Sequence, residues 1–348
     1  MTIERDFSLT DNDKEILIKL KDFIPEKIFD MHTHLYNSVY CPNMTKPGLL
    51  FYEFAELTAK GGVVDRESFM RFQVPLYNNA KQIRLNVISM PDASMTDLSN
   101  GNRAGSNEFL VRHLEQNSGD VGEAMVLAND KDEDIKNLLV HPSIRGFKCY
   151  HLTAARKPTW QAEIDEYLPE SAWRAADDSG LCITLHMVKD DALADPGNIK
   201  NISEKTRKYP SANLILAHAA RGFAPWTAIE GVKRLSDFTN IYFDLSAVCE
   251  PTAMMAVIKA VGSDRVFWGS DFPASMMRGK CVSIGASFNW LYGAMLEPID
   301  NPAPVRPALV GVENLFAFWQ ASELLDLSRD EIEGIFYYNA MKLFRLED

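Results

Sequence analysis

The sequence predicts an α/β protein folded as a (β/α)₈, or TIM, barrel, and two patterns support this prediction. Eight short runs of apolar, β-branched and aromatic residues recur along the chain, and helix-like segments lie between them. Runs that are apolar throughout are typical of parallel strands, which are buried on both faces. Strands that alternate with helices indicate parallel βαβ units, and eight such units favour a closed barrel over an open sheet.

The predicted strands and helices follow from local sequence patterns. The strands are expected at 28–36, 84–92, 124–130, 144–152, 181–189, 213–221, 241–248 and 266–273. Helices are expected at 165–179, 198–208 and 251–261, and they are followed by Gly180, Pro210 and Gly262. Glycine commonly ends a helix because it adopts the left-handed conformation, and proline cannot continue one.

We expect a single domain over residues 1–348, with the barrel core at about 28–275 and extra helices around it. The long connection at 36–82 is expected to hold helices that cap the barrel mouth. Residues 9–22 predict a helix packed outside the barrel, and the chain from Glu313 onward predicts terminal helices. Ser328 and Glu331 have the spacing of a helix capping box.

The composition excludes some classes of partner. A formal net charge of −12 argues against nucleic acid and anionic membranes, since both attract a positive surface. The N-terminus lacks the apolar core of a signal peptide, and no apolar run approaches the ~20 residues of a membrane span. The five cysteines include no C-x-x-C pair, which fits reduced thiols. We therefore expect a cytoplasmic protein that acts on a small molecule, either as a monomer or as a homo-oligomer.

Five of the seven histidines lie toward the C-terminal ends of predicted strands, where the active-site mouth of a parallel barrel forms. These five are His32, His34, His151, His186 and His218, whereas His113 and His141 are expected to be structural. His32 and His34 are two residues apart on one strand, so both rings point into the barrel. Two imidazoles at this spacing can bind one divalent metal.

Asp271 brings a carboxylate to the same region. It lies in GSDFP on the last predicted strand, which a closed barrel places beside the first strand. A buried carboxylate needs a partner, and a metal ion provides one. An isolated His-x-His pair is more often structural. The pair combined with Asp271, His186 and His218 matches one catalytic divalent ion with a water in the open position. Zinc is the expected metal, with manganese as the alternative.

Four segments of this constellation resemble the amidohydrolase superfamily, specifically its amidohydrolase-related branch. They are FDMHTHLY, ITLHMV, LILAHAARGF and VFWGSDFP, and the C-terminal YYNAMKLFRL resembles the closing helix of that branch. The resemblance covers the chain from the first strand onward. It implies a metal-dependent hydrolase, lactonase or decarboxylase of small carboxylated compounds. By this resemblance His32, His34, His186 and Asp271 bind the metal, and His218 is a catalytic group or an extra ligand.

Three further residues are candidates for binding the substrate. Lys148, in RGFKCYH, corresponds to a lysine that is carboxylated and bridges two metals in binuclear members of the superfamily. Members of the resembling branch more often hold one metal, so we interpret Lys148 as a contact for a substrate anion. The alternative is a lysine with its ammonium group in solvent. His151 is either a second contact or a loop histidine. Arg221 is either a carboxylate clamp or a member of a surface ion pair.

The expected reaction is hydrolysis of a small carboxylated lactone, ester or amide by metal-activated water. In this scheme Asp271 takes a proton, and His218 contacts the substrate carbonyl or protonates the leaving group. Non-oxidative decarboxylation is the main alternative, because it needs the same ligands, and isomerisation of a sugar acid is a third. A degenerate barrel kept as a scaffold would show an eroded ligand set, which this sequence does not.

Overall fold

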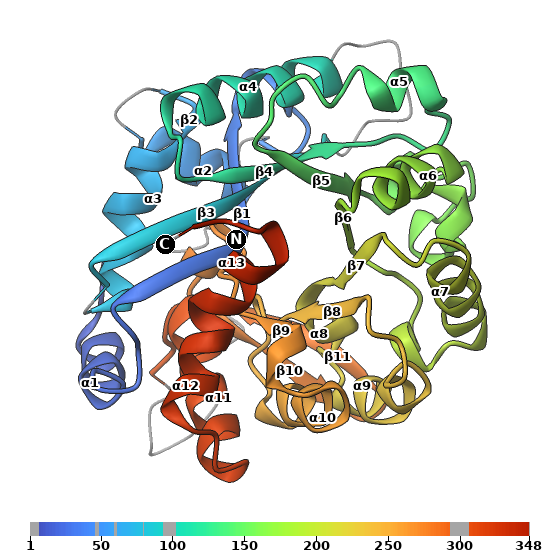
Figure 1. Cartoon of the computed structure of the whole chain (residues 1–348). Helices are drawn as coiled ribbons and strands as arrows, with labels where there is room; N and C mark the ends of the chain where they lie inside the picture. The colour runs from blue at the N-terminus through green and yellow to red at the C-terminus, as the bar shows by residue number, and fades with distance from the viewer. Residues whose placement is uncertain are drawn as a thin grey trace.

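The computed structural model describes residues 7–45, 49–58, 61–78, 80–92, 102–292 and 306–347. Eight parallel strands follow one another around a ring (Figure 1). They are β1 (Lys27–Asn37), β3 (Gln82–Ser89), β4 (Val121–Met125), β5 (Ile144–Cys149), β6 (Cys182–Leu185), β7 (Asn213–Leu216), β8 (Ile241–Asp244) and β9 (Val266–Phe267). A short strand, β2 (Val63–Val64), pairs antiparallel with the end of β1. This ninth strand is not predicted by the sequence.

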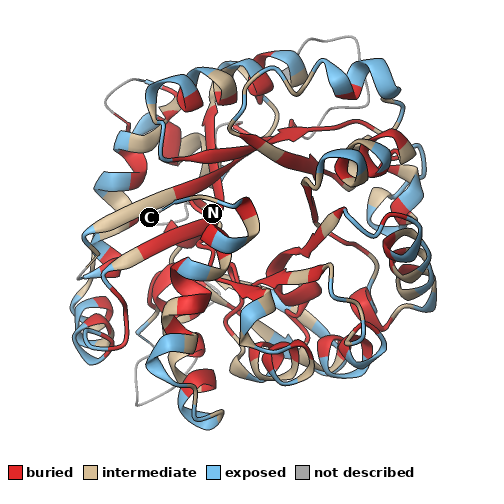
Figure 2. Cartoon of the chain, viewed as in Figure 1, coloured by how far each residue is buried: buried red, intermediate tan, exposed pale blue. Residues whose placement is uncertain are grey.

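Hydrogen bonds join the segment that directly follows β9 to the first strand, β1. The backbone N–H of Met31 donates to the carbonyl of Trp268 at 3.0 Å, and that of His34 donates to Phe272 at 2.8 Å. A parallel bridge between Thr33 and Phe272 continues this pairing. The arrangement agrees with the predicted (β/α)₈ barrel, and the strands are largely buried while the outer faces of the helices are exposed (Figure 2).

Helices cover the outside of the ring (Figure 1). They include α4 (Asn102–Gln116), α5 (Asp132–Lys136), α6 (Glu170–Ser179), α7 (Pro196–Lys208), α9 (Pro225–Gly231) and α10 (Pro251–Val261). The bounds predicted for α10 are confirmed, and α7 begins two residues earlier than expected. Helix α6 begins at Glu170 rather than 165 because Pro169 disfavours helical backbone in the residue before it. Gly180 ends α6 in the left-handed conformation, as predicted.

Several predicted strands extend too far in the C-terminal direction. Strand β4 occupies Val121–Met125 instead of 124–130, and β7 ends at Leu216 instead of 221. Strand β9 contains only Val266–Phe267, although the pairing of Phe272 shows that the following residues stay beside β1. The apolar runs continue past each strand because the loops at the barrel mouth are buried as well. Apolar content alone therefore misplaced the strand ends.

The connection between β1 and β3 contains α2 (Leu50–Glu56) and α3 (Arg66–Phe72), as expected from its length. That these helices cap the barrel mouth stays a prediction. The N-terminal helix is α1 (Asp11–Lys19), and the C-terminal region contains α11 (Val310–Leu324), α12 (Arg329–Glu333), a π-helical turn η11 (Gly334–Tyr338) and α13 (Asn339–Phe344). The capping box of Ser328 and Glu331 is present. In the described residues, no helix is both long and apolar enough to cross a membrane.

An antiparallel hairpin, β10 (Gly279–Ile284) with β11 (Ser287–Tyr292), follows the last barrel strand. The sequence analysis did not anticipate it. Its turn is fixed to α9, because the indole N–H of Trp226 donates to the carbonyl of Ala286 at 2.8 Å. Ser283 adds a second attachment, from its backbone N–H to Glu250 at 3.3 Å.

Candidate metal centre

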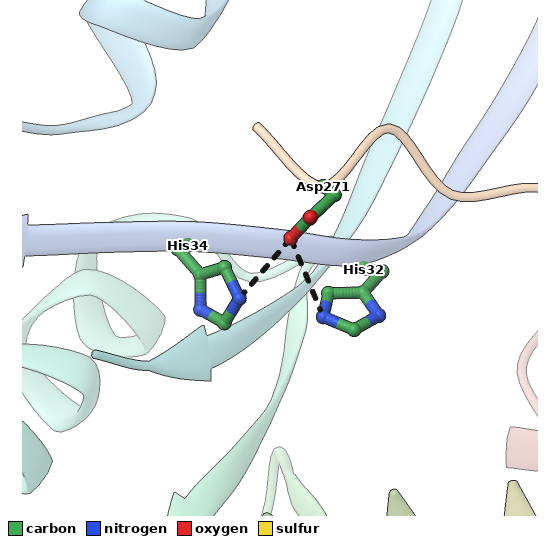
Figure 3. Close-up of side chains that lie close together, drawn as sticks. All are labelled: His32, His34 and Asp271. Carbon is green, nitrogen blue, oxygen red and sulfur yellow. Dashed lines mark ion pairs between the residues drawn. The ribbon is translucent and has the colours of Figure 1, made fainter. Parts of the chain in front are cut away.

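Strand β1 and the segment after β9 bring three predicted ligands together (Figure 3). The Nε2 atoms of His32 and His34 lie 3.6 and 3.4 Å from one carboxylate oxygen of Asp271. Donors around a tetrahedral ion, with bonds of about 2.0–2.1 Å, are separated by about 3.3 Å. The triangle of donor atoms therefore fits a small divalent ion. Asp271 keeps 17% of its side chain exposed, so the triangle is open on one side.

The other nitrogen of each ring is held by a separate group. Nδ1 of His34 lies 3.2 Å from the carbonyl oxygen of Ile88, and Nδ1 of His32 lies 3.0 Å from Oδ2 of Asp244. These contacts place a proton on Nδ1 of each ring, so that the lone pair lies on Nε2, the nitrogen on the Asp271 side. Burial, followed by the charge of Lys148, lowers the pKa of His32 to about 3, so this ring is neutral.

Asp244, at the end of β8, is the functional residue that the sequence analysis missed. Its second oxygen accepts hydrogen bonds from the backbone N–H groups of His218 and Ser246, both at 3.0 Å, and from the Ser246 hydroxyl. Burial alone would raise the pKa of Asp244, but His32 and these donors hold it below its ordinary value. The available signal was a lone carboxylate in the otherwise apolar run 241–248, beside strand-end histidines.

His186 and His218 form a pair next to this triangle. Nε2 of His218 lies 3.1 Å from Nδ1 of His186, and Nδ1 of His218 lies 3.0 Å from the carbonyl oxygen of Ser246. Among the described residues, two groups have ligand atoms within 4.8 Å of one another. One group is His32, His34 and Asp271, and the other is His32, His218 and Asp244. His186 belongs to neither, so its assignment as a ligand stays a prediction.

Lys148 on β5 points into the barrel. Its Nζ lies 3.3 Å from Nε2 of His32, and only 1% of the residue is exposed. The interpretation that its ammonium group reaches solvent is therefore wrong. Burial lowers the pKa of Lys148, while the nearby carboxylates Asp244 and Glu123 oppose that effect.

Arg221 and His151 lie near His186. In the described part of the chain Arg221 forms no ion pair, so the interpretation as a surface ion pair is not supported. Its Nε is buried and has no hydrogen-bond partner among these residues. The His151 ring is 6.3 Å from that of His186, and its Nδ1 lies 2.9 Å from the Thr159 hydroxyl. Burial, followed by the charge of Arg221, lowers the pKa of His151.

The backbone around the centre is unusual as well. Residues 218–221 all have left-handed φ angles of 49–59°, and φ of Asp271 is 58°. Such a conformation costs about 1–2 kcal/mol for each non-glycine residue. Strained residues of this kind persist where the surroundings fix them, and they cluster at functional sites. Here they lie where the chain leaves β7, and where Asp271 meets the rings of His32 and His34.

The fold and this group of histidines and carboxylates define a barrel protein whose interior holds residues that could bind a metal ion. The chain belongs to the amidohydrolase family, because the family model Amidohydro_2, described as Amidohydrolase, matches residues 29–346. Members of this family are enzymes and include hydrolases and decarboxylases.

Individual proteins that resemble this chain have low sequence identity to it. An L-fucono-1,5-lactonase of Burkholderia ambifaria is 25% identical over 186 residues, which is 49% of this chain and 60% of the lactonase. The match therefore covers less than two thirds of that relative. An amidohydrolase from Burkholderia multivorans with bound zinc has a TM-score of 0.58 and 11% identity, over 92% of this chain and 100% of that structure. The 5-carboxyvanillate decarboxylase of Sphingomonas paucimobilis has a TM-score of 0.54 and 12% identity, over 93% and 100%. At these identities the two structures support the fold.

Proposed function

We propose that the protein is a metal-dependent hydrolase of a small carboxylated lactone, ester or amide. The observation that carries this proposal is the open triangle of two imidazole nitrogens and one carboxylate oxygen, in which the oxygen lies 3.4 and 3.6 Å from the nitrogens and all three atoms lie within 4.8 Å of one another. His32, His34 and Asp271 would hold one divalent ion, with zinc expected and manganese as the alternative. His186 would be the fourth ligand.

A divalent ion held there would supply a Lewis acid that polarises a carbonyl group and acidifies water. The residues of the chain then manage the proton and the orientation of the substrate. Asp271 receives the proton at its carboxylate, as its partly exposed position allows. Nδ1 of His218 faces the carbonyl of Ser246, and its Nε2, which lies 3.1 Å from Nδ1 of His186, would contact the substrate carbonyl only when it carries a proton.

The substrate carboxylate is assigned to the positively charged side of the centre. Arg221 is the main contact, since its planar guanidinium group is charged at neutral pH and has no carboxylate partner among the described residues. His151 is a second contact, because its Nδ1 is taken by Thr159 and its other nitrogen remains available. Lys148 would contribute a buried positive charge beside His32.

The position of Lys148 also favours a second candidate, decarboxylation of a small carboxylic acid. An ammonium group 3.3 Å from His32 would attract a carboxylate to the reacting centre rather than to its periphery. The fold similarity to the 5-carboxyvanillate decarboxylase is compatible with this alternative.

Metal analysis and a substrate screen test the proposal together. We expect about one zinc or manganese ion per chain by elemental analysis, in keeping with a single three- or four-ligand site. Asp271→Asn and His186→Ala should lose both metal and turnover. His141→Ala changes a loop histidine outside the centre and should keep both. The screen should include L-fucono-1,5-lactone, carboxylated lactones and aromatic carboxylates.

The outcomes separate the candidates. Release of a hydroxy acid from a lactone supports hydrolysis, whereas release of carbon dioxide from an aromatic carboxylate supports decarboxylation. Active protein without metal would contradict both. Normal metal content in His186→Ala would remove this residue from the ligand set and leave the triangle as the site.

A further inference from the structure

The hairpin β10–β11 places an aromatic cluster against the metal centre. Phe223 stacks on the His218 ring, with the two ring centroids 5.4 Å apart. Phe288 and Trp290 of the hairpin pack on Phe223 at 5.1 and 5.4 Å. We call Phe223, Phe288 and Trp290 the aromatic wall. It therefore joins a late segment of the chain to a histidine of the centre.

The two hairpin members of the wall keep part of their surface exposed, whereas Phe223 is 6% exposed. Phe288 and Trp290 are two residues apart on β11, so they project from the same face of the hairpin. Trp226 and Glu250 fix the hairpin to the barrel through backbone atoms of Ala286 and Ser283. The exposed aromatic surface is thus held in a constant place beside the centre.

The aromatic wall also contacts Arg221, the residue predicted to bind the substrate carboxylate. The guanidinium carbon of Arg221 lies 5.3 Å from the centre of the Phe288 ring, within the range of a cation–π contact. The carboxylate that acts most on the pKa of Arg221 is Asp190, which forms no ion pair with it. Phe288 can therefore set the orientation of this guanidinium group, whose Nε has no hydrogen-bond partner among the residues that the structure describes.

We propose that the β10–β11 hairpin determines the substrate specificity of this enzyme. Phe288 is a positioning residue that orients Arg221 toward a substrate carboxylate, and Trp290 provides a flat apolar surface for the substrate ring. This assignment rests on the proposed function and deepens it. It predicts a substrate that combines a carboxylate with a planar, unsaturated or aromatic ring, in preference to a polyhydroxylated sugar acid. A flat aromatic surface stacks on such a ring, whereas an open-chain polyhydroxylated acid has no flat face to place against it.

Binding of unreactive ligands tests the wall without requiring turnover. The zinc-loaded protein is titrated calorimetrically with benzoate, its uncharged analogue benzamide, and D-gluconate. We expect benzoate to bind more tightly than the other two. Phe288→Leu should weaken benzoate and gluconate about tenfold, the size of a cation–π contact in a partly buried site, and leave benzamide unchanged. Trp290→Leu should weaken benzoate and leave gluconate unchanged.

A double-mutant cycle separates positioning from general structural damage. If Phe288 acts through Arg221, Phe288→Leu should weaken gluconate binding no further in an Arg221→Ala background. Phe288→Tyr keeps the ring and should restore binding. Phe316→Leu is a matched control, since Phe316 also contacts a cation, Lys19, but lies on α11. Equal losses for charged and uncharged ligands in Phe288→Leu, or additive losses in the cycle, would overturn the assignment.

The failure of the proposed function would look different. If the protein binds benzoate through Arg221 and Phe288 but neither hydrolyses lactones nor binds metal, the proposed hydrolase is wrong. The role of the aromatic wall in substrate binding then still stands. If lactones are hydrolysed with metal bound, but the Phe288 and Trp290 variants keep the affinities of the unmodified protein, the hydrolase stands and the wall is wrong.

Discussion

At the scale of the residue, one buried carboxylate, Asp244, forms hydrogen bonds to two histidines of the centre. Asp244 contacts the ring of His32 and the backbone of His218, so one carboxylate orients a predicted ligand and a predicted catalytic residue. A carboxylate behind a ligating histidine fixes the tautomer and raises the basicity of the ring. The geometry of the triangle of His32, His34 and Asp271 thus depends on a residue outside it.

Replacing Asp244 should therefore weaken metal binding. Asp244→Asn keeps the shape but loses the negative charge opposite Nδ1 of His32, and loss of such a partner typically costs 10–100-fold in metal affinity. Competition with a chelator measures the metal dissociation constant. Asp120→Asn is the control, since Asp120 is also buried and pairs with a histidine, His113, away from the centre. Equal metal affinities in the two variants would contradict the role of Asp244.

Arg221 should act on substrate binding rather than on the chemical step. Arg221→Ala removes a charge-assisted pair with a substrate carboxylate, a loss on the order of 2–5 kcal/mol when the partner stays buried. We expect a strongly raised KM for carboxylated substrates, with a smaller change in kcat. Asp271→Asn should instead lower kcat, because it removes a base and a ligand together. Steady-state kinetics on a carboxylated substrate distinguish the two, and an unchanged KM in Arg221→Ala would remove the clamp.

At the scale of the element, left-handed backbone conformations end helix α6 and form the turn after β7. Gly180 ends α6 with φ of 64°, where a side chain is disfavoured. Residues 218–221 adopt the same region without glycine. The end of α6 uses glycine, which adopts a left-handed φ with little strain. The turn after β7 adopts the same φ without glycine, and the buried hydrogen bonds of His218 hold it in place.

Substitution at this cap isolates the conformational cost. A Cβ added at Gly180 meets no atom within 4 Å, so Gly180→Ala should lower the free energy of unfolding by about 1 kcal/mol through backbone strain alone. Gly119→Ala is the control, since it has equal space without a left-handed φ. Urea denaturation of both variants measures the difference, and metal content should be unchanged in each. A Gly180→Ala variant as stable as the control would show that the cap carries no strain.

At the scale of the whole molecule, the barrel interior contains buried acids as well as apolar layers. Glu123 on β4 is fully buried, and one of its oxygens accepts hydrogen bonds from Asn86 at 2.7 Å and Thr184 at 2.8 Å. Its other oxygen has no hydrogen-bond partner in the described part of the chain. Burial raises the pKa of Glu123 to about 7, against an ordinary value of 4.5. The folded protein therefore favours the protonated acid.

This shift predicts how stability depends on pH. Between pH 4.5 and about 7 the unfolded chain releases the Glu123 proton while the folded chain keeps it, so stability falls as the pH rises. The full loss is on the order of 3 kcal/mol. Glu123→Gln cannot ionise and should lack this component. The measurement is the difference between the two unfolding curves over pH 4.5–8, which cancels shared groups such as Asp30 and His32. A difference independent of pH would contradict the raised pKa.

The local sequence was sufficient for the order of the barrel strands, for several of the helices and for much of the centre, but not for β2 or the β10–β11 hairpin. Pro251 and Gly262 bracket α10, and the i, i+2 spacing of His32 and His34 placed both rings on one side of a strand. The contact of Asp271 with these rings followed from closing the barrel. Asp244 was not found, because its role depends on distant neighbours, and an aspartate in an apolar strand has no local signature of its partner.

The sequence by itself determined the alternation of strands and helices, the family resemblance and the location of the histidines at strand ends. These features repeat with local periods, or depend on short motifs, so neighbouring residues suffice to encode them. Only the tertiary structure decided that His186 contacts His218, that Lys148 is buried beside His32, and that the hairpin brings Phe288 to Arg221. These contacts join residues 32–116 positions apart or lie between different elements. They are fixed by how the closed barrel packs, which no local pattern records.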